Sequence, residues 1–393
     1  MTQGVTCLVT IHGMGFQHAP QEGGQGYADG LHAQLQRHLP ELGGDPVPEF
    51  GRPAGVGAVY VHSDWPPGSG EIEEGLKRLG VWRQGDMSHR AVDITNVPLV
   101  DERHHIAHVA LVYAGLEEPQ PHLGSTVEMV ARAVVSHGKY ASLPSMVGMG
   151  VMDLWTAIKH QMQGPGEPTP SLQVRSKTAP GRSGVGAQPE ASDAFAVLRA
   201  LDQDVTTYIC RNDLRERVRS FAHDALLRLC FREDVTSIVL NAHSQGTILA
   251  FDVLRILPPI AAAKVKGFVT AGSPLRKYAD LFYWGTDAGS ICHVPWTNVW
   301  DDTDPVADPL VPPKDWRRGQ ALPPSPGYSE LYQTIDQTSG HPVPIKIVDT
   351  QVTNAAHGAG GGLAAHNYWD NEEEFVKPLA DTLQHVLSSP PTR

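Results

Sequence analysis

The chain has 393 residues, of which 41% are hydrophobic and 19% are charged, a composition typical of a folded globular protein rather than a disordered one. Its 43 acidic residues outnumber its 31 basic ones, which gives a formal charge of −12, and Lys and Arg form no run. We therefore expect no nucleic-acid partner, because a nucleic-acid-binding surface needs clustered basic residues.

Membrane insertion and export are not indicated either. Nowhere do about 18 apolar residues follow one another, as a transmembrane helix requires. The first residues lack the basic segment and the long apolar run of a signal peptide. The four cysteines, at positions 7, 210, 230 and 292, lie far apart without a CxxC pair, which is typical of reduced thiols. We expect a cytoplasmic protein.

Short β-prone apolar runs predict strands, and apolar residues spaced three or four apart predict helices. The first half of the chain is predicted to hold, in order, a strand at 5–11, a helix at 27–39, strands at 56–61 and 106–113, and helices at 126–135 and 147–158. A stretch at 164–192 is dense in Gly, Pro and Ser and is predicted to be disordered.

The second half continues the alternation of helices and strands. It is predicted to hold a helix at 195–228, a strand at 236–241, a helix at 246–257, strands at 267–271, 296–300 and 345–348, and a helix at 372–387. Strands that alternate with helices favour an α/β fold with a mostly parallel sheet.

A serine stands between one of these strands and the following helix, in the sequence AHSQG at 242–246. This is a version of the G-x-S-x-G nucleophile elbow with alanine in place of the first glycine. A serine on such a sharp turn needs a strained backbone, so small residues are required at Ala242 and Gly246. Ser244 is therefore the predicted nucleophile. The N–H of Gln245, at the helix N-terminus, is a predicted donor to an oxyanion.

A second oxyanion donor has to come from another loop. The first predicted strand ends in His-Gly-Met-Gly at 12–15, which resembles the H-G-x-G loop that supplies such a donor. Glycines on both sides let the backbone approach a substrate closely. We assign this role to the N–H of Met14.

A serine nucleophile needs a base and an acid, which follow it along the chain in the order acid, then histidine. Four carboxylates follow the strand at 296–300, in the sequence DDTDPVAD at 301–308. We choose Asp304 as the acid because it lies within the loop proper, with Asp301 and Asp302 as alternatives. We choose His366 as the base because it follows a Gly-rich loop and precedes the last helix, with His357 as the alternative.

Together these segments resemble the α/β-hydrolase superfamily, particularly esterases and lipases with H-S-x-G elbows. The landmarks occur in the family's order: HGMG at 12–15, AHSQG at 242–246, GSPL at 272–275, WDDTDPV at 300–306 and HNYW at 366–369. The resemblance implies one α/β-hydrolase domain over 1–393, with a mostly parallel sheet flanked by helices. The long separation of the first two landmarks implies a large helical cap or insertion at 65–230.

The resemblance also implies a reaction. Ser244 would form an acyl-enzyme from a carboxylic ester, His366 would carry the proton, and Asp304 would hold the imidazole in its tautomer. The substrate would be a small-molecule or lipid ester, and we expect no cofactor and no metal, since no clustered ligand motif is present. Two alternatives stay open: a thioesterase or acyltransferase with the same triad, and an inactive hydrolase-fold binding protein.

Overall fold

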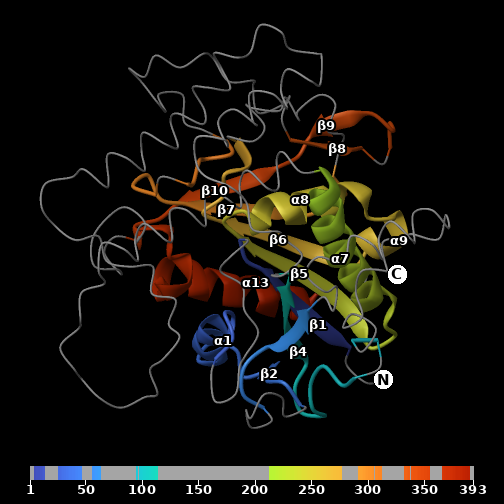
Figure 1. Ribbon diagram of the computed structural model, residues 1–393, viewed down its shortest axis with the longest axis vertical. Coiled ribbons are helices and arrows are strands. Elements are labelled where there is room, and N and C mark those ends of the chain that lie inside the picture. The colour runs from blue at the N-terminus through green and yellow to red at the C-terminus, as the bar shows by residue number, and fades with distance from the viewer. Residues whose placement is uncertain are drawn as a thin grey trace, which may run out of the picture.

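The computed structural model of the chain is shown in Figure 1. It describes residues 4–13, 25–46, 55–62, 94–95, 97–113, 212–276, 291–304, 306–311, 332–336, 338–354 and 365–389.

A parallel sheet forms the centre of the described structure (Figure 1). Its strands lie in the order β10–β7–β6–β5–β1–β4–β2, β3 also pairs with β4, and all of these pairings are parallel. The strands are β1 (Val5–Ile11), β2 (Leu42–Gly43), β3 (Val59–His62), β4 (Ile106–Val112), β5 (Val235–His243), β6 (Val265–Ala271), β7 (Trp296–Trp300) and β10 (Ile347–Gln351). A separate antiparallel pair is formed by β8 (Gln333–Ile335) and β9 (Pro342–Pro344).

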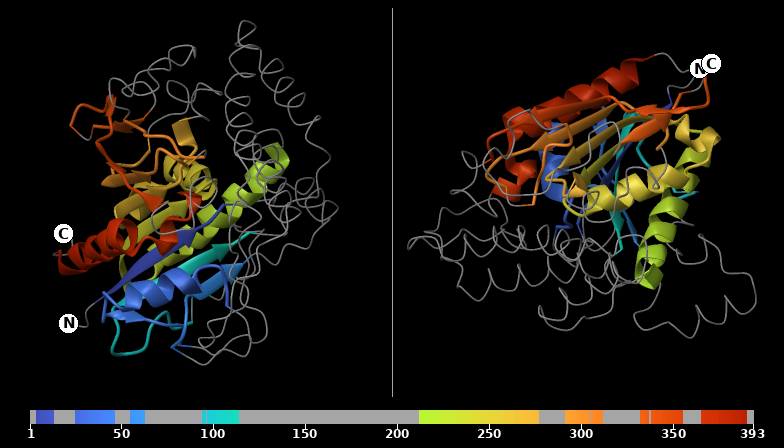
Figure 2. Two further views of the ribbon diagram at one scale, coloured as in Figure 1. Left: turned by 90° about the vertical axis from the view of Figure 1, so that its left-hand side faces the viewer. Right: turned by 90° about the horizontal axis from the view of Figure 1, so that it is seen from above.

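Helices cover both faces of this sheet, as the view from above in Figure 2 shows. On one face lie α7 (Asn212–Phe231) and α8 (Gly246–Ile256), and on the other lie α1 (Asp29–Gln36) and α13 (Lys377–Ser388). The other helical segments of the described residues are short: α9 (Pro259–Ala262), the 3₁₀ turn η4 (Tyr368–Asp370) and the π-helical turn η5 (Glu372–Val376).

The central strand β1 shows why the sequence folds in this way. Cys7, Val9 and Ile11 join the apolar core under α7 and α8, while Leu8 joins the core under α1 and α13. All seven residues of β1 are buried. A strand between two helical layers has to be apolar on both faces, and the nearly unbroken apolar run at 5–11 meets this requirement.

The chain reverses its direction of travel across the sheet beside β1. After β1 it forms β2 and β3, which both pair with β4, then β4 itself beside β1, and then β5 on the other side of β1. In open α/β sheets, ligands bind at such a switch point, beyond the carboxyl ends of the two strands. The carboxyl ends of β1 and β5 lead into His12 and Ser244.

The predicted α/β class with a mostly parallel sheet is confirmed. The strands predicted at 5–11 and 296–300 coincide with β1 and β7. The strand predicted at 345–348 begins and ends too early, because the N–H of Ile345 bonds to Tyr332 next to the β8–β9 pair, and β10 begins only at Ile347. The helix predicted at 372–387 is divided into η5 and α13. The β8–β9 pair was not predicted.

The predicted insertion at 65–230 lies only in part within the described residues. Two of its pieces, β4 and most of α7, belong to the core: β4 pairs with β1, and α7 packs on α8 and β5. The predicted helices at 126–135 and 147–158 and the stretch at 164–192 lie outside the described residues, as does most of the predicted cap.

Candidate active site

Ser244 occupies a tight turn between β5 and α8. Its φ angle is 56°, and no other non-glycine residue of the described ranges has a positive φ. This left-handed conformation costs an ordinary L-residue roughly 1–2 kcal/mol. Hydrogen bonds hold it in place: the N–H of Ser244 donates to Ala271 on β6 (2.9 Å), and its carbonyl accepts from the hydroxyl (2.7 Å) and the N–H (3.0 Å) of Thr247.

The glycine two residues after the serine is required by the end of β1. A Cβ on Gly246 would collide with the carbonyl oxygen of Ile11 and would lie 2.7 Å from that of His12. The loop after β1 also approaches the serine, since a Cβ on Gly13 would lie 3.2 Å from Ser244 Oγ. The glycine that the motif demands at 246 is therefore explained by the close approach of the end of β1 to the turn.

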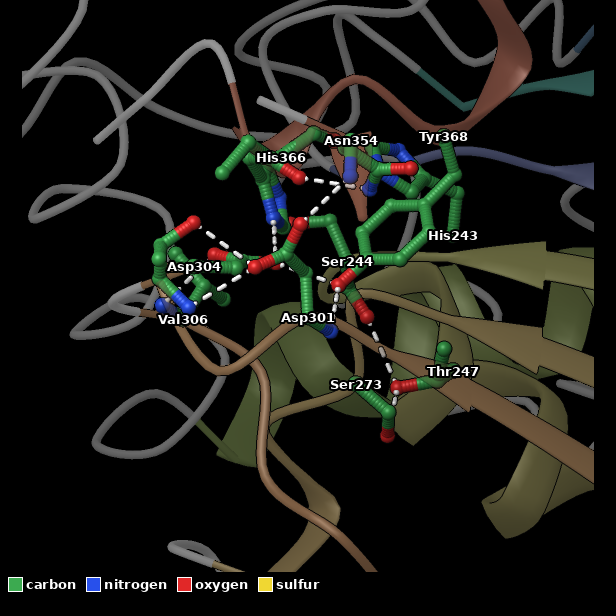
Figure 3. A network of polar contacts seen from close by, with 12 residues as sticks. His243, Ser244, Thr247, Ser273, Asp301, Asp304, Val306, Asn354, His366 and Tyr368 are labelled. Carbon is green, nitrogen blue, oxygen red and sulfur yellow. Dashed lines mark hydrogen bonds and ion pairs between the residues drawn. The ribbon is translucent and has the colours of Figure 1, made fainter. Parts of the chain in front are cut away.

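Asp304 and His366 form a buried pair, which Figure 3 shows in one polar network with Ser244. His366 Nδ1 lies 2.8 Å from Asp304 Oδ2. The carboxylate also accepts from the N–H of Val306 (2.9 Å) and the hydroxyl of Tyr368 (2.9 Å). Burial alone would raise the pKa of Asp304, but His366 and these hydrogen bonds outweigh it, so the pKa lies below its ordinary value. The acid is therefore ionised at neutral pH.

Tyr368 keeps its proton in this network. Burial, reinforced by the negative charge of Asp304, raises the pKa of Tyr368 well above its ordinary value. The protonated hydroxyl donates to Asp304 and accepts from the N–H of Asp301 at 2.9 Å. Tyr368 thereby links the acid to the end of β7.

The second ring nitrogen of His366 is buried and has no hydrogen-bond partner among the described residues. Since Asp304 accepts only, Nδ1 carries a proton, and in the neutral ring Nε2 carries a lone pair. Only 2% of His366 is exposed, so solvent does not readily compensate this lone pair. A base needs such a lone pair, and in unliganded sites its contact to the nucleophile is often long.

Gly272 lets the ring of His366 lie next to the serine turn, because a larger residue would occupy the same space. Gly272 follows Ala271, whose carbonyl accepts from the N–H of Ser244, and has a φ of +60°. A Cβ at Gly272 would lie 2.7 Å from Cε1 and 2.9 Å from Nδ1 of His366. The imidazole therefore packs directly on the backbone segment whose carbonyl, at Ala271, pairs with Ser244.

The two alternative acids have other positions. Asp301 is buried, but its Oδ1 accepts from the N–H and hydroxyl of Thr303, and its Oδ2 accepts from the N–H of Asn354. Asp302 is exposed. Of the three candidates, Asp304 is the one that bonds to the predicted base. The alternative base, His357, lies outside the described residues.

The structure describes one of the two predicted oxyanion donors, Gln245, but not the other, Met14. The N–H of Gln245 lies in the first turn at α8, 3.4 Å from the position that a Cβ on Gly13 would take. Met14 lies outside the described residues, one position beyond Gly13. The described end of this loop, His12–Gly13, does border the serine turn, as the sequence predicted.

The sequence did not indicate several residues that support the site. Tyr368 bonds to Asp304, Thr247 bonds to the carbonyl of Ser244, and His243 bonds to the backbone of His366. Ser273 Oγ lies 2.9 Å from Thr247 Oγ1 and extends this support to the segment after β6. Tyr368 and Ser273 lie within the HNYW and GSPL landmarks, so their places were marked but their roles were not.

Within the described ranges, no group of three or more His, Cys, Asp or Glu side chains is placed to hold a metal ion. Among those same residues, no helix is both long and apolar enough to cross a membrane.

Searches against protein-family models, curated proteins and solved structures found no match to this chain.

Proposed function

We propose that this protein is a serine hydrolase of the α/β-hydrolase fold that cleaves carboxylic esters through an acyl-enzyme on Ser244. The observation that carries the proposal is the strained φ of 56° at Ser244, on a turn that packs against a buried histidine–aspartate pair. Strain at a single polar residue is a mark of functional sites, since folding alone gains nothing from it.

The reaction begins with Ser244. As its Oγ attacks the ester carbonyl, His366 Nε2 takes the hydroxyl proton, and the C–O double bond opens to an oxyanion. The Gln245 N–H and a donor from the loop after His12, for which we propose Met14, stabilise that oxyanion. Each such donor contributes about 3–4 kcal/mol in enzymes of this kind.

The proton then moves to the leaving group. His366 protonates the alkoxide as the ester C–O bond breaks, and the alcohol departs from the acyl-enzyme. Water then attacks the acyl carbon as His366 Nε2 takes one of its protons. When the bond from the acyl carbon to Ser244 Oγ breaks, His366 returns that proton to Oγ, which releases the carboxylic acid and restores the serine hydroxyl. Asp304 stays ionised throughout and stabilises the imidazolium, as its lowered pKa allows.

Access to the site is a further part of the proposal. The strands β3 and β4 run parallel to β5, so they end at the same edge of the sheet as Ser244. Each is followed by chain within the 65–230 range, where we propose a cap that selects the ester.

The test is hydrolysis of p-nitrophenyl esters of increasing acyl length by the wild type and by Ser244→Ala. The proposal predicts turnover by the wild type and a loss of about 10⁶-fold in kcat for the variant, as for nucleophile removal in other serine hydrolases. Thr6→Ala is a control, because this buried threonine lies at the opposite end of β1 from the site. Equal turnover by Ser244→Ala and the wild type would contradict the proposal.

A further inference from the structure

A second buried histidine lies next to the proposed base. His243 is the last residue of β5 and directly precedes Ser244, and 4% of it is exposed. Its ring centroid is 4.6 Å from that of His366 and 4.7 Å from that of His12. The reaction proposed above assigns this ring no role.

The contacts of His243 fix the position of its proton. Its Nε2 lies 2.8 Å from the carbonyl oxygen of His366, which can only accept, so Nε2 donates. Burial, followed by the proximity of His366 and His12, lowers the pKa of His243 well below its ordinary value, so the ring is neutral. A neutral imidazole has one N–H, and Nδ1 of His243 is therefore an acceptor.

This acceptor faces the loop after β1. His243 Nδ1 lies 3.1 Å from His12 Nε2, which must donate to it. His12 Nδ1 also lies 3.2 Å from the carbonyl of Gly13. A neutral His12 has one N–H and can donate to only one of these two acceptors, and the shorter contact, to His243, places the proton on Nε2. A protonated His12 donates to both. In either state the bond to His243 is kept.

The result is a continuous chain of hydrogen bonds. It runs from His12 through the ring of His243 to the backbone carbonyl of His366. The residue before the base is held in a similar way, because Asn354 Nδ2 donates to the carbonyl of Ala365 at 2.7 Å. Two successive carbonyls at the base are thus tied to side chains from other elements.

We propose that His243 is a positioning residue, which sets the backbone of His366 against the oxyanion loop at His12–Gly13. This inference rests on the proposed function. Asp304 bonds only to the ring of His366. The distance from that ring to Ser244 also depends on the position of the His366 backbone. A displacement of about 1 Å in such a site costs roughly 10²-fold in rate. His243 and His12 keep that distance because together they join the backbone of His366 to the loop that follows β1.

The test compares two substitutions of His243 in the full chain. His243→Phe keeps a ring but has no hydrogen-bonding atom, and we expect kcat for a p-nitrophenyl ester to fall about 10²-fold with KM little changed. His243→Gln offers an amide N–H to His366 and an amide oxygen to His12, and we expect it to recover most of the loss. A purely space-filling role would give the opposite order, with Phe the better replacement.

A matched control separates positioning from stability. His108 is also buried and also pairs with a histidine, His32, at 3.3 Å, but lies in the middle of β4 opposite Leu8. We expect His108→Phe to lower the melting temperature without lowering kcat. If His243→Phe destabilises the chain but keeps the wild-type kcat, the inference is overturned.

The coupling to His12 is tested by a double-mutant cycle. Since both rings belong to one chain of bonds, His12→Phe with His243→Phe should lose little more than the more damaging single change. Fully additive losses would overturn the coupling. If the wild type turns over the ester and Ser244→Ala does not, the proposed function holds. An unchanged kcat in His243→Phe would then overturn only the positioning role of His243. No turnover by the wild type would overturn both proposals.

Discussion

Substitution of Gly272 by alanine tests how closely the backbone after β6 supports the base. Two costs follow from the structure. A φ of +60° is unfavourable for alanine by roughly 1–2 kcal/mol. In addition, the new Cβ would lie 2.7 Å from Cε1 of His366 and 2.9 Å from a ring carbon of Tyr368, where ordinary contacts begin at 3.4 Å.

The second cost falls on catalysis. Relief of the 2.7 Å contact to 3.4 Å requires a movement of 0.7 Å (3.4 − 2.7). A shift of that size along the bond from His366 Nδ1 to Asp304 would stretch it from 2.8 Å to about 3.5 Å, the limit of a hydrogen bond. We therefore expect kcat to fall about 10²-fold, equivalent to about 2.7 kcal/mol in the activation free energy.

The assay pairs steady-state hydrolysis of a p-nitrophenyl ester with urea unfolding. Gly340→Ala is a matched control, because Gly340 has a similar φ of +69° but nothing within 4 Å of its added Cβ. It should lose about 1–2 kcal/mol of unfolding free energy and keep the wild-type kcat. If Gly272→Ala also keeps kcat within twofold, the proposed contact between this backbone and the base is refuted.

Two further predictions concern the acid and a buried histidine pair. Asp304→Asn should lower kcat about 10⁴-fold, since an amide favours the wrong imidazole tautomer, while the exposed Asp302→Asn should leave kcat unchanged; equal effects in the two variants would contradict the choice of acid. Burial, followed by its neighbour His32, lowers the pKa of His108 well below 6.5, so the unfolded chain binds a proton that the folded chain does not. The corresponding stability is present above pH 6.5 and is lost as the pH falls below it. Urea unfolding at pH 7.5 and 5.5 should show a smaller loss in His108→Phe than in the wild type, and an equal loss would refute the assignment.

The sequence predicted the parts of the fold that local pattern determines. β1 is a nearly unbroken apolar run, and β7 is a short segment rich in Trp and Val that ends before Asp301, and both were located residue by residue. β8 and β9 contain only three residues each, and two of the three residues of β9 are prolines, so neither segment resembles a strand locally. Their pairing depends on contacts made elsewhere, such as the bridge between Ile291 and Thr334.

The site residues also fall into those that local sequence predicted and those that it did not. Ser244 was predicted from its motif, and Asp304 and His366 were predicted from the order of acid and base along the chain and from the loops in which they lie. The structure brings those two together, although their catalytic roles remain predictions. His243 and Tyr368 were missed because their roles arise from bonds between distant segments, which no local spacing reveals.

Covalent labelling with a fluorophosphonate, followed by peptide mapping, tests directly whether Ser244 is a reactive nucleophile. We expect a stoichiometric adduct on the peptide that contains Ser244 in the folded wild type, and none in Ser244→Ala. A folded wild type that forms no adduct, or one that carries it on a different residue, would rule out this role of Ser244.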